Sequence, residues 1–194
     1  RRRKKRRRRK GIKDKRGVIP NMKTIHERPK EATLREETGH WEGDLVVGKD
    51  HQSAILTLVD RKTRYVIIEP LTEGLGAEAM VQACLKGFDA IPPELRKTLT
   101  YDRGKEMSCH EQLTETIGIK VYFADPHAPW QRGTNENTNG LIREFFPKGT
   151  DLFLFSREEV KEVESLLNSR PRKILQFATP SKLMQKEIVA VRRS

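Results

Sequence analysis

The chain reads WEGDLVVGKDHQSAILTLVDRKTRYVIIE over residues 41–69, a stretch of three strand-like runs separated by short polar turns. In the first run apolar side chains occupy one face and Glu42 and Asp44 the other, because successive side chains of a strand alternate. The second run is almost wholly apolar, which indicates an interior strand. Short turns between strands predict an antiparallel meander. The three predicted strands are residues 41–47, 54–59 and 65–69.

Downstream of the meander the apolar residues change to helical spacing, and helices then alternate with short strands. The predicted helices include two that begin at capping boxes, formed by Ser108 with Glu111 and by Ser156 with Glu159. The whole order predicts an α/β protein with a ribonuclease H-like fold, in which a mixed sheet of a three-strand antiparallel meander plus parallel strands carries helices on both faces. The later elements are expected at residues 80–88 (helix), 98–101 (strand), 108–117 (helix), 120–123 (strand), around Glu136 (helix), 156–169 (helix) and from Thr179 (helix).

Positive charge is concentrated at the start of the chain. Residues 1–30 hold 16 Lys/Arg and two Asp/Glu, whereas the other 164 residues hold 23 and 25. We therefore divide the chain into a basic, flexible arm at 1–39 and a ribonuclease H-like core with C-terminal helices at 40–194. A solvated tail or a targeting signal is the alternative, but a run of like charges suits a polyanion such as DNA. The predicted contacts of the arm are Arg1, Arg2, Arg3, Lys4, Lys5, Arg6, Arg7, Arg8, Arg9 and Lys10.

Other general features exclude several classes of protein. No apolar run is long enough to span a membrane, and no secretory segment opens the chain. Cys84 and Cys109 form no CxxC motif, so neither a disulfide framework nor a zinc site is expected. Because the first residue is Arg1, we expect a fragment of a longer protein. These features predict a location in a reducing cytoplasm.

Three acids occupy special places in the predicted order. Asp44 lies inside a strand, Asp102 closes a later strand, and Glu136 lies on a helix, with 33 residues between Asp102 and Glu136. Carboxylate oxygens are the ligands that Mg²⁺ prefers, and a two-metal site cleaves phosphodiesters. The three acids are thus a candidate site for two Mg²⁺ ions, with Mn²⁺ as a substitute. The alternative is that these acids are structural or solvated, as Asp60 is expected to be at its turn.

Further candidate DNA contacts lie near these acids in the predicted order, and each has an alternative in which it does not contact DNA. Trp130 can stack on a base or pack against the protein, and His127 is expected to shape its loop. Three cations can bind phosphates or remain solvated, namely Lys105, Arg132 and Arg143.

Three sequence motifs resemble those of the bacterial insertion-sequence-30 family of transposases. They are HWEGD at residues 40–44, TYDRGKE at 100–106 and PHAPWQRGTNENTNG at 126–140, of which the third is long and specific. The resemblance covers about residues 17–190 and implies an integrase-type core whose DDE triad is Asp44, Asp102 and Glu136. Family members also carry an upstream helix-turn-helix region that recognises the terminal inverted repeats, and nothing in this chain matches it.

The resemblance implies a metal-dependent enzyme that cleaves DNA at insertion-sequence ends and transfers the strand to a target. Its partners would be double-stranded DNA, as terminal inverted repeats and target, and further copies of itself, because two ends are joined. No membrane partner is expected. Two alternatives remain open: a ribonuclease H-like nuclease that only hydrolyses, and a non-catalytic DNA-binding protein.

Overall fold

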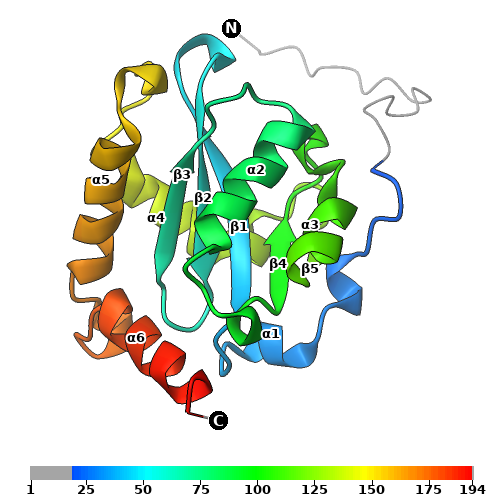
Figure 1. Cartoon of the computed structure of the whole chain (residues 1–194), viewed down its shortest axis with the longest axis vertical. Helices are drawn as coiled ribbons and strands as arrows, with labels where there is room; N and C mark the ends of the chain where they lie inside the picture. The colour runs from blue at the N-terminus through cyan, green and yellow to red at the C-terminus, as the bar shows by residue number, and fades with distance from the viewer. Residues whose placement is uncertain (1–18, 194) are drawn as a thin grey trace, which may run out of the picture.

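A computed structural model describes residues 19–193, built around one five-stranded sheet (Figure 1). The strand order is β3-β2-β1-β4-β5. The first three strands pair antiparallel, whereas β4 pairs parallel to both β1 and β5. The predicted antiparallel meander with added parallel strands is therefore confirmed. The strands are β1 His40–Val47, β2 Ala54–Asp60, β3 Val66–Pro70, β4 Thr98–Tyr101 and β5 Lys120–Phe123.

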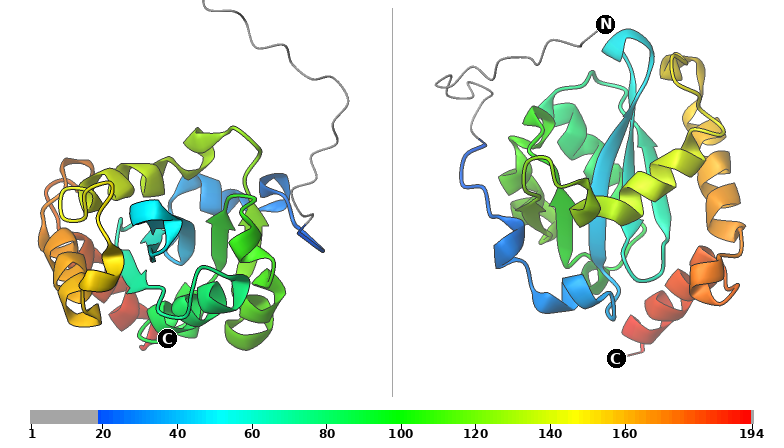
Figure 2. Two further views of the ribbon diagram at one scale, coloured as in Figure 1. Left: turned by 90° about the horizontal axis from the view of Figure 1, so that it is seen from above. Right: turned by 180° about the vertical axis from the view of Figure 1, so that it is seen from behind.

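Helices cover both faces of the sheet, as predicted. Seen from above, α2 and α3 lie against one face and α4 crosses the other (Figure 2). None of the helices within residues 19–193 combines the length and hydropathy that crossing a bilayer needs. The α-helices are α1 Lys30–Leu34, α2 Ala77–Phe88, α3 His110–Ile117, α4 Gly133–Ile142, α5 Arg157–Ser169 and α6 Pro180–Val191. Short 3-10 helices occupy η1 Ile25–Glu27, η2 Lys49–His51, η3 Pro93–Leu95, η4 Lys105–Met107, η5 Pro129–Arg132, η6 Leu152–Leu154 and η7 Lys173–Leu175.

The sheet separates two apolar cores because its interior strands present apolar side chains to both faces. Every residue of β2 is buried, with Leu56 and Leu58 in the core under α2 and α3, and Ile55 and Val59 in the core under α4 and α5. The apolar run at residues 54–59 is thus explained by burial on both sides.

Residues 19–39 differ from the expectation of an arm without packed structure up to residue 40. Ile19 and Ala32 are buried, and Thr24 forms a parallel bridge with Phe123 at the edge of β5. The physical reason is that Ile19 and Met22 pack into the apolar core that includes Phe123 of β5, while the bridge at Thr24 extends the sheet edge. The proposed contacts Arg1 to Lys10 lie outside the described residues.

Of the two predicted capping boxes, one is present and one is not. The Ser156–Glu159 capping box is present at the start of α5. The predicted Ser108–Glu111 capping box is wrong. The N-cap of α3 is Cys109, one residue later than predicted, and no side chain caps the helix. Asp60 does cap its turn, accepting hydrogen bonds from the backbone N–H groups of Lys62 and Thr63.

Candidate active site

Asp44 and Asp102 lie together because β1 and β4 are parallel neighbours at the centre of the sheet. The guanidinium of Arg132, which precedes α4, pairs with both carboxylates. Its Nη1 lies 3.3 Å from Oδ1 of Asp44, and its Nη2 lies 3.0 Å from Oδ2 of Asp102. The two carboxylates are therefore close enough to share one cation.

Each aspartate is also held by a neutral donor. Nδ2 of Asn139 donates to Oδ2 of Asp44 at 2.9 Å, and the backbone N–H of Gly104 donates to Oδ1 of Asp102 at 2.9 Å. Arg132 is anchored in turn, because its Nη1 donates to the carbonyl oxygen of Gly43 at 3.0 Å. The orientations of both carboxylates are thus set by the protein.

The electrostatics of the pair reflect burial and crowding of charge. Burial, helped by the charge of Asp102, raises the pKa of Asp44 although Arg132 opposes the shift. Burial alone would lower the pKa of Arg132, but the two aspartates raise it. A fourth acid, Glu106, has its pKa raised by burial and then by the charges of both aspartates. This is a region of concentrated negative potential, in which a cation is favoured.

Among residues 19–193, Glu136, the third predicted acid, forms no hydrogen bond or ion pair with Asp44 or Asp102. Its side chain is exposed on α4. Within residues 19–193, no three acids, histidines or cysteines are arranged to hold one metal ion. The structure thus brings together two of the three predicted ligands and carries the third on the adjoining helix.

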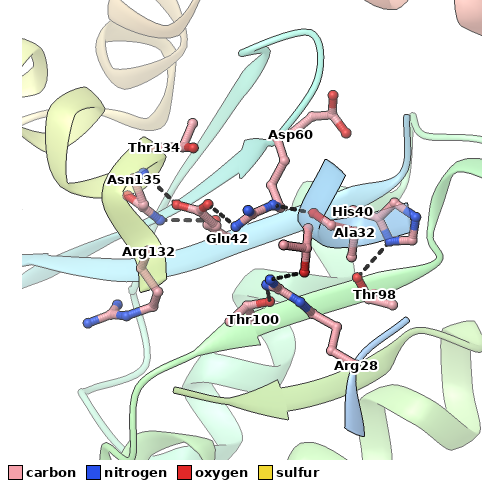
Figure 3. Close-up of polar contacts among 12 residues, drawn as sticks. Arg28, Ala32, His40, Glu42, Asp60, Thr98, Thr100, Arg132, Thr134 and Asn135 are labelled. Atoms are coloured by element: carbon pink, nitrogen blue, oxygen red, sulfur yellow. Dashed lines mark hydrogen bonds and ion pairs between the residues drawn. The ribbon is translucent and has the colours of Figure 1, made fainter. Parts of the chain in front are cut away.

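The helix that carries Glu136 is fastened to the sheet by a buried polar network (Figure 3). Glu42 is fully buried on β1 and accepts the backbone N–H of Asn135 at 2.9 Å. Nδ2 of Asn135 donates to the carbonyl oxygens of Glu42 and Thr57. Arg61 forms an ion pair with the other oxygen of Glu42. Every polar group named here has a partner, so the network rigidly positions α4 over β1 and β2.

Sequence reasoning missed the roles of Asn135 and Glu42. The available clue was a pair of asparagines, Asn135 and Asn139, four residues apart on a predicted helix. Asparagine is a weak helix former, so a pair on one face indicates side chains used for specific hydrogen bonds. Both amides meet at the hydroxyl of Thr57, at 2.9 Å and 3.0 Å.

The other predicted contacts have different surroundings. Trp130 is 73% exposed, so the alternative that it packs against the protein is wrong. Lys105 is also exposed. Arg143 donates to the backbone carbonyl oxygens of Val47 and Phe146, which gives it a structural contact. His127 lines a hollow of about 210 Å³ beside Asp102.

This donor set suits a divalent cation with oxygen ligands. The bridging guanidinium shows that one positive group can reach both aspartates, and the nearby Glu106 adds to the negative potential. Carboxylate oxygens are what Mg²⁺ prefers, and one or two of them with waters and substrate oxygens are enough. The residues present therefore fit a metal ion shared by Asp44 and Asp102.

Comparison with known proteins agrees with this geometry. Residues 35–129 match the family described as "Integrase core domain", a range that includes both aspartates and ends before α4. The chain is 47% identical over 171 residues to the transposase for insertion sequence element IS1086 of Cupriavidus metallidurans, covering 88% of the chain and 50% of that protein. It is 50% identical over 170 residues to the transposase InsI for IS30A of Escherichia coli, covering 88% and 44%. The chain spans about half the length of the curated relatives it matches.

Proposed function

Since this chain carries an integrase core of the kind found in insertion-sequence transposases, we propose that it performs DNA cleavage and strand transfer at the ends of an insertion sequence. The observation that carries the proposal is the pairing of Asp44 and Asp102 around one positive group. Asp60 and Glu42, whose roles are structural, are fully buried with their partners, whereas Asp44 and Asp102 are partly exposed. Because these two carboxylates can be reached from solvent, the arginine that they share can be exchanged for another cation.

Enzymes with this kind of core generally use divalent metal ions. We propose two Mg²⁺ ions, replaceable by Mn²⁺, with Asp44 and Asp102 sharing one and Glu136 completing the set. When bound, the ions lower the pKa of a water or hydroxyl nucleophile and stabilise the negative charge that develops on the phosphate.

The proposed role of the surrounding residues is to orient the carboxylates that would hold the metal ions. Asn139 and Gly104 keep the two aspartates oriented, and Arg132 leaves the space between them. Glu136 extends from α4, which the Glu42–Asn135 contact holds against the sheet.

The proposed reaction has two phosphoryl transfers. In the first, a water oxygen bonds to the phosphorus at the element end, and the bond to the 3′ oxygen breaks, leaving a free 3′-OH. In the second, that 3′ oxygen bonds to a phosphorus of the target, and the target's own 3′ oxygen departs with a proton. No covalent link between protein and DNA is needed.

The DNA substrates would be the terminal inverted repeats of the element and a target duplex. Because two ends must be joined to one target, we propose that two or more copies act together on DNA. The alternatives are a nuclease that only hydrolyses and a DNA-binding protein whose acids are structural.

The test is a pair of assays in Mg²⁺ and in Mn²⁺: nicking of a duplex, and joining of an end that already carries a free 3′-OH. Asp44→Asn, Asp102→Asn and Glu136→Gln are expected to abolish both reactions. Glu115→Gln, which changes an exposed acid on α3, is the matched control and should retain both. Nicking without joining would favour the hydrolytic enzyme. Full activity in all three variants would reject the catalytic assignment.

A further inference from the structure

A second candidate site lies beside α4 and is lined by three arginines. It is a hollow of about 490 Å³ between α4, the β2–β3 turn and the segments that follow α1 and α5. The arginines come from three separate parts of the chain, so the fold, and not one local run, gathers them. The polar residues around the hollow include Arg35, Arg64, Arg172, Thr134, Asn137 and Thr138.

Within residues 19–193 the three arginines of this hollow form no ion pair with an acid, although the charges of Glu42 and Asp60 act to raise the pKa of Arg64 and that of Glu144 acts to raise the pKa of Arg172. Among residues 19–193, the ion pairs within 4.0 Å involve other cations, and none includes Arg35, Arg64 or Arg172. Burial, followed by the charge of Arg35, lowers the pKa of Arg64, so these two guanidiniums act on each other. Gathering like charges in this way costs free energy unless an anion joins them.

The hydrogen-bond donors of the arginines are also only partly used. Arg64 donates from Nη1 to the hydroxyl of Thr134 at 2.7 Å, and Arg172 donates from Nη2 to the carbonyl oxygen of Leu167 at 3.0 Å. The buried Nε atoms of Arg64 and Arg172 have no hydrogen-bond partner. Guanidinium groups with free donors match the oxygens of a phosphate in both charge and shape.

The position of the hollow relates it to the candidate active site. Thr134, Asn137, Thr138 and Leu141 line the hollow from one side of α4. Asn139, which contacts Asp44, lies on another side of the same helix, and Arg132, which contacts both aspartates, directly precedes it. A helix with its side chains is about 10–12 Å across, so one DNA duplex lying over α4 can reach both sides.

We propose that this hollow binds a phosphate group of the DNA backbone and so fixes the duplex across α4. The inference rests on the proposed function for the identity of the ligand as DNA. A backbone phosphate carries no sequence information, so the contact would add affinity and alignment without selecting a sequence.

The experiment measures binding of the full chain to a duplex of unrelated sequence over a range of salt concentrations. The variants are Arg35→Gln, which removes a guanidinium that forms no ion pair with residues 19–193, and Arg35→Gln combined with Arg172→Gln. Arg193→Gln makes the same charge change outside the hollow and is the control. Each lost phosphate contact is expected to reduce the slope of log K against log salt by about 0.9, while Arg193→Gln leaves the slope unchanged.

A second readout separates binding from folding. Without DNA, Arg35→Gln should melt at the same temperature as the parent or higher, because it removes repulsion from Arg64. An unchanged salt slope in both variants, or an equal decrease in Arg193→Gln, would overturn the site. A normal decrease in slope with no nicking or joining by the parent would support the phosphate site and reject the proposed chemistry. Retained nicking with unchanged salt slopes would support the proposed chemistry and reject the phosphate site.

Discussion

The backbone N–H of Asn135 donates a hydrogen bond to Oε2 of the fully buried Glu42 at 2.9 Å. This contact joins β1, which carries Asp44, to α4, which carries Glu136. Glu42 and Asp44 are two residues apart on the same face of one strand, yet they have opposite surroundings. Glu42 is enclosed by fixed donors, whereas Asp44 is partly exposed beside Arg132. The two acids are therefore expected to respond oppositely to the same change.

Glu42→Gln is expected to destabilise the fold by about 3 kcal/mol or more, because it leaves the charge of Arg61 buried without its partner. The measurement is the free energy of unfolding in urea. Loss of activity should follow only from the loss of folded protein and of α4 positioning. A variant as stable as the parent would contradict the structural role of this network.

Asp44→Asn is expected to keep or raise the melting temperature at neutral pH. Burial raises the pKa of Asp44 above its ordinary value of 3.8, so the folded state disfavours the carboxylate. The favourable contribution of the protonated form is present below the unfolded pKa and is lost as pH rises through the folded pKa. The parent should therefore lose stability relative to the variant as pH rises from below 3.8, and the two should converge at acid pH. Melting curves across this range test it, and a variant that melts lower at neutral pH would show that Asp44 is structural.

Gly43→Ala is expected to destabilise the protein by about 1–3 kcal/mol through overpacking. A Cβ at residue 43 would lie 2.7 Å from Cδ2 of the buried Tyr101 ring, which explains the glycine beside Asp44. Gly140→Ala is the control, because a Cβ there meets nothing within 4 Å. That change should stabilise α4 by up to about 1 kcal/mol through helix propensity. Equal effects of the two changes in urea unfolding would contradict this packing.

Arg132→Gln is expected to lower the melting temperature in the absence of divalent metal, because Asp44 and Asp102 then lose their shared positive group. Adding Mn²⁺ should raise the melting temperature of the variant by more than that of the parent, since no arginine competes for the carboxylates. Arg103→Gln, at the exposed pair with Asp125, is the control and should respond to Mn²⁺ as the parent does. Equal Mn²⁺ shifts in all three proteins would mean that metal and arginine occupy different places.

Deletion of residues 1–16 is expected to weaken binding to all duplexes about equally and to flatten the dependence on salt. The ten cations at the start of the chain would contact phosphates and release counterions. Titrations of several unrelated duplexes at a series of salt concentrations measure both effects. Loss of sequence discrimination with the salt slope intact would mean that this segment reads bases.

Local periods in the sequence were enough to predict the architecture. The five strands lie within one residue of their expected bounds, because alternation and apolar runs are properties of neighbouring residues. The Ser156–Glu159 box was equally local and was correct. The Ser108–Glu111 box failed although its spacing was right, because the chain enters α3 from the 3-10 helix η4 and places Cys109 at the cap.

The sequence by itself determined the order of the elements, the three acids at strand and helix positions, and the basic start of the chain. Only the tertiary structure decided what surrounds those acids. It placed Arg132 between Asp44 and Asp102, and it buried Glu42 against Asn135, a residue 93 positions away. It also gathered Arg35, Arg64 and Arg172 around one hollow. The hydrophobic periodicity of a segment shows which face of a helix or strand is apolar. A contact between β1 and α4 depends instead on how the whole chain packs, which the spacing of residues within one segment does not specify.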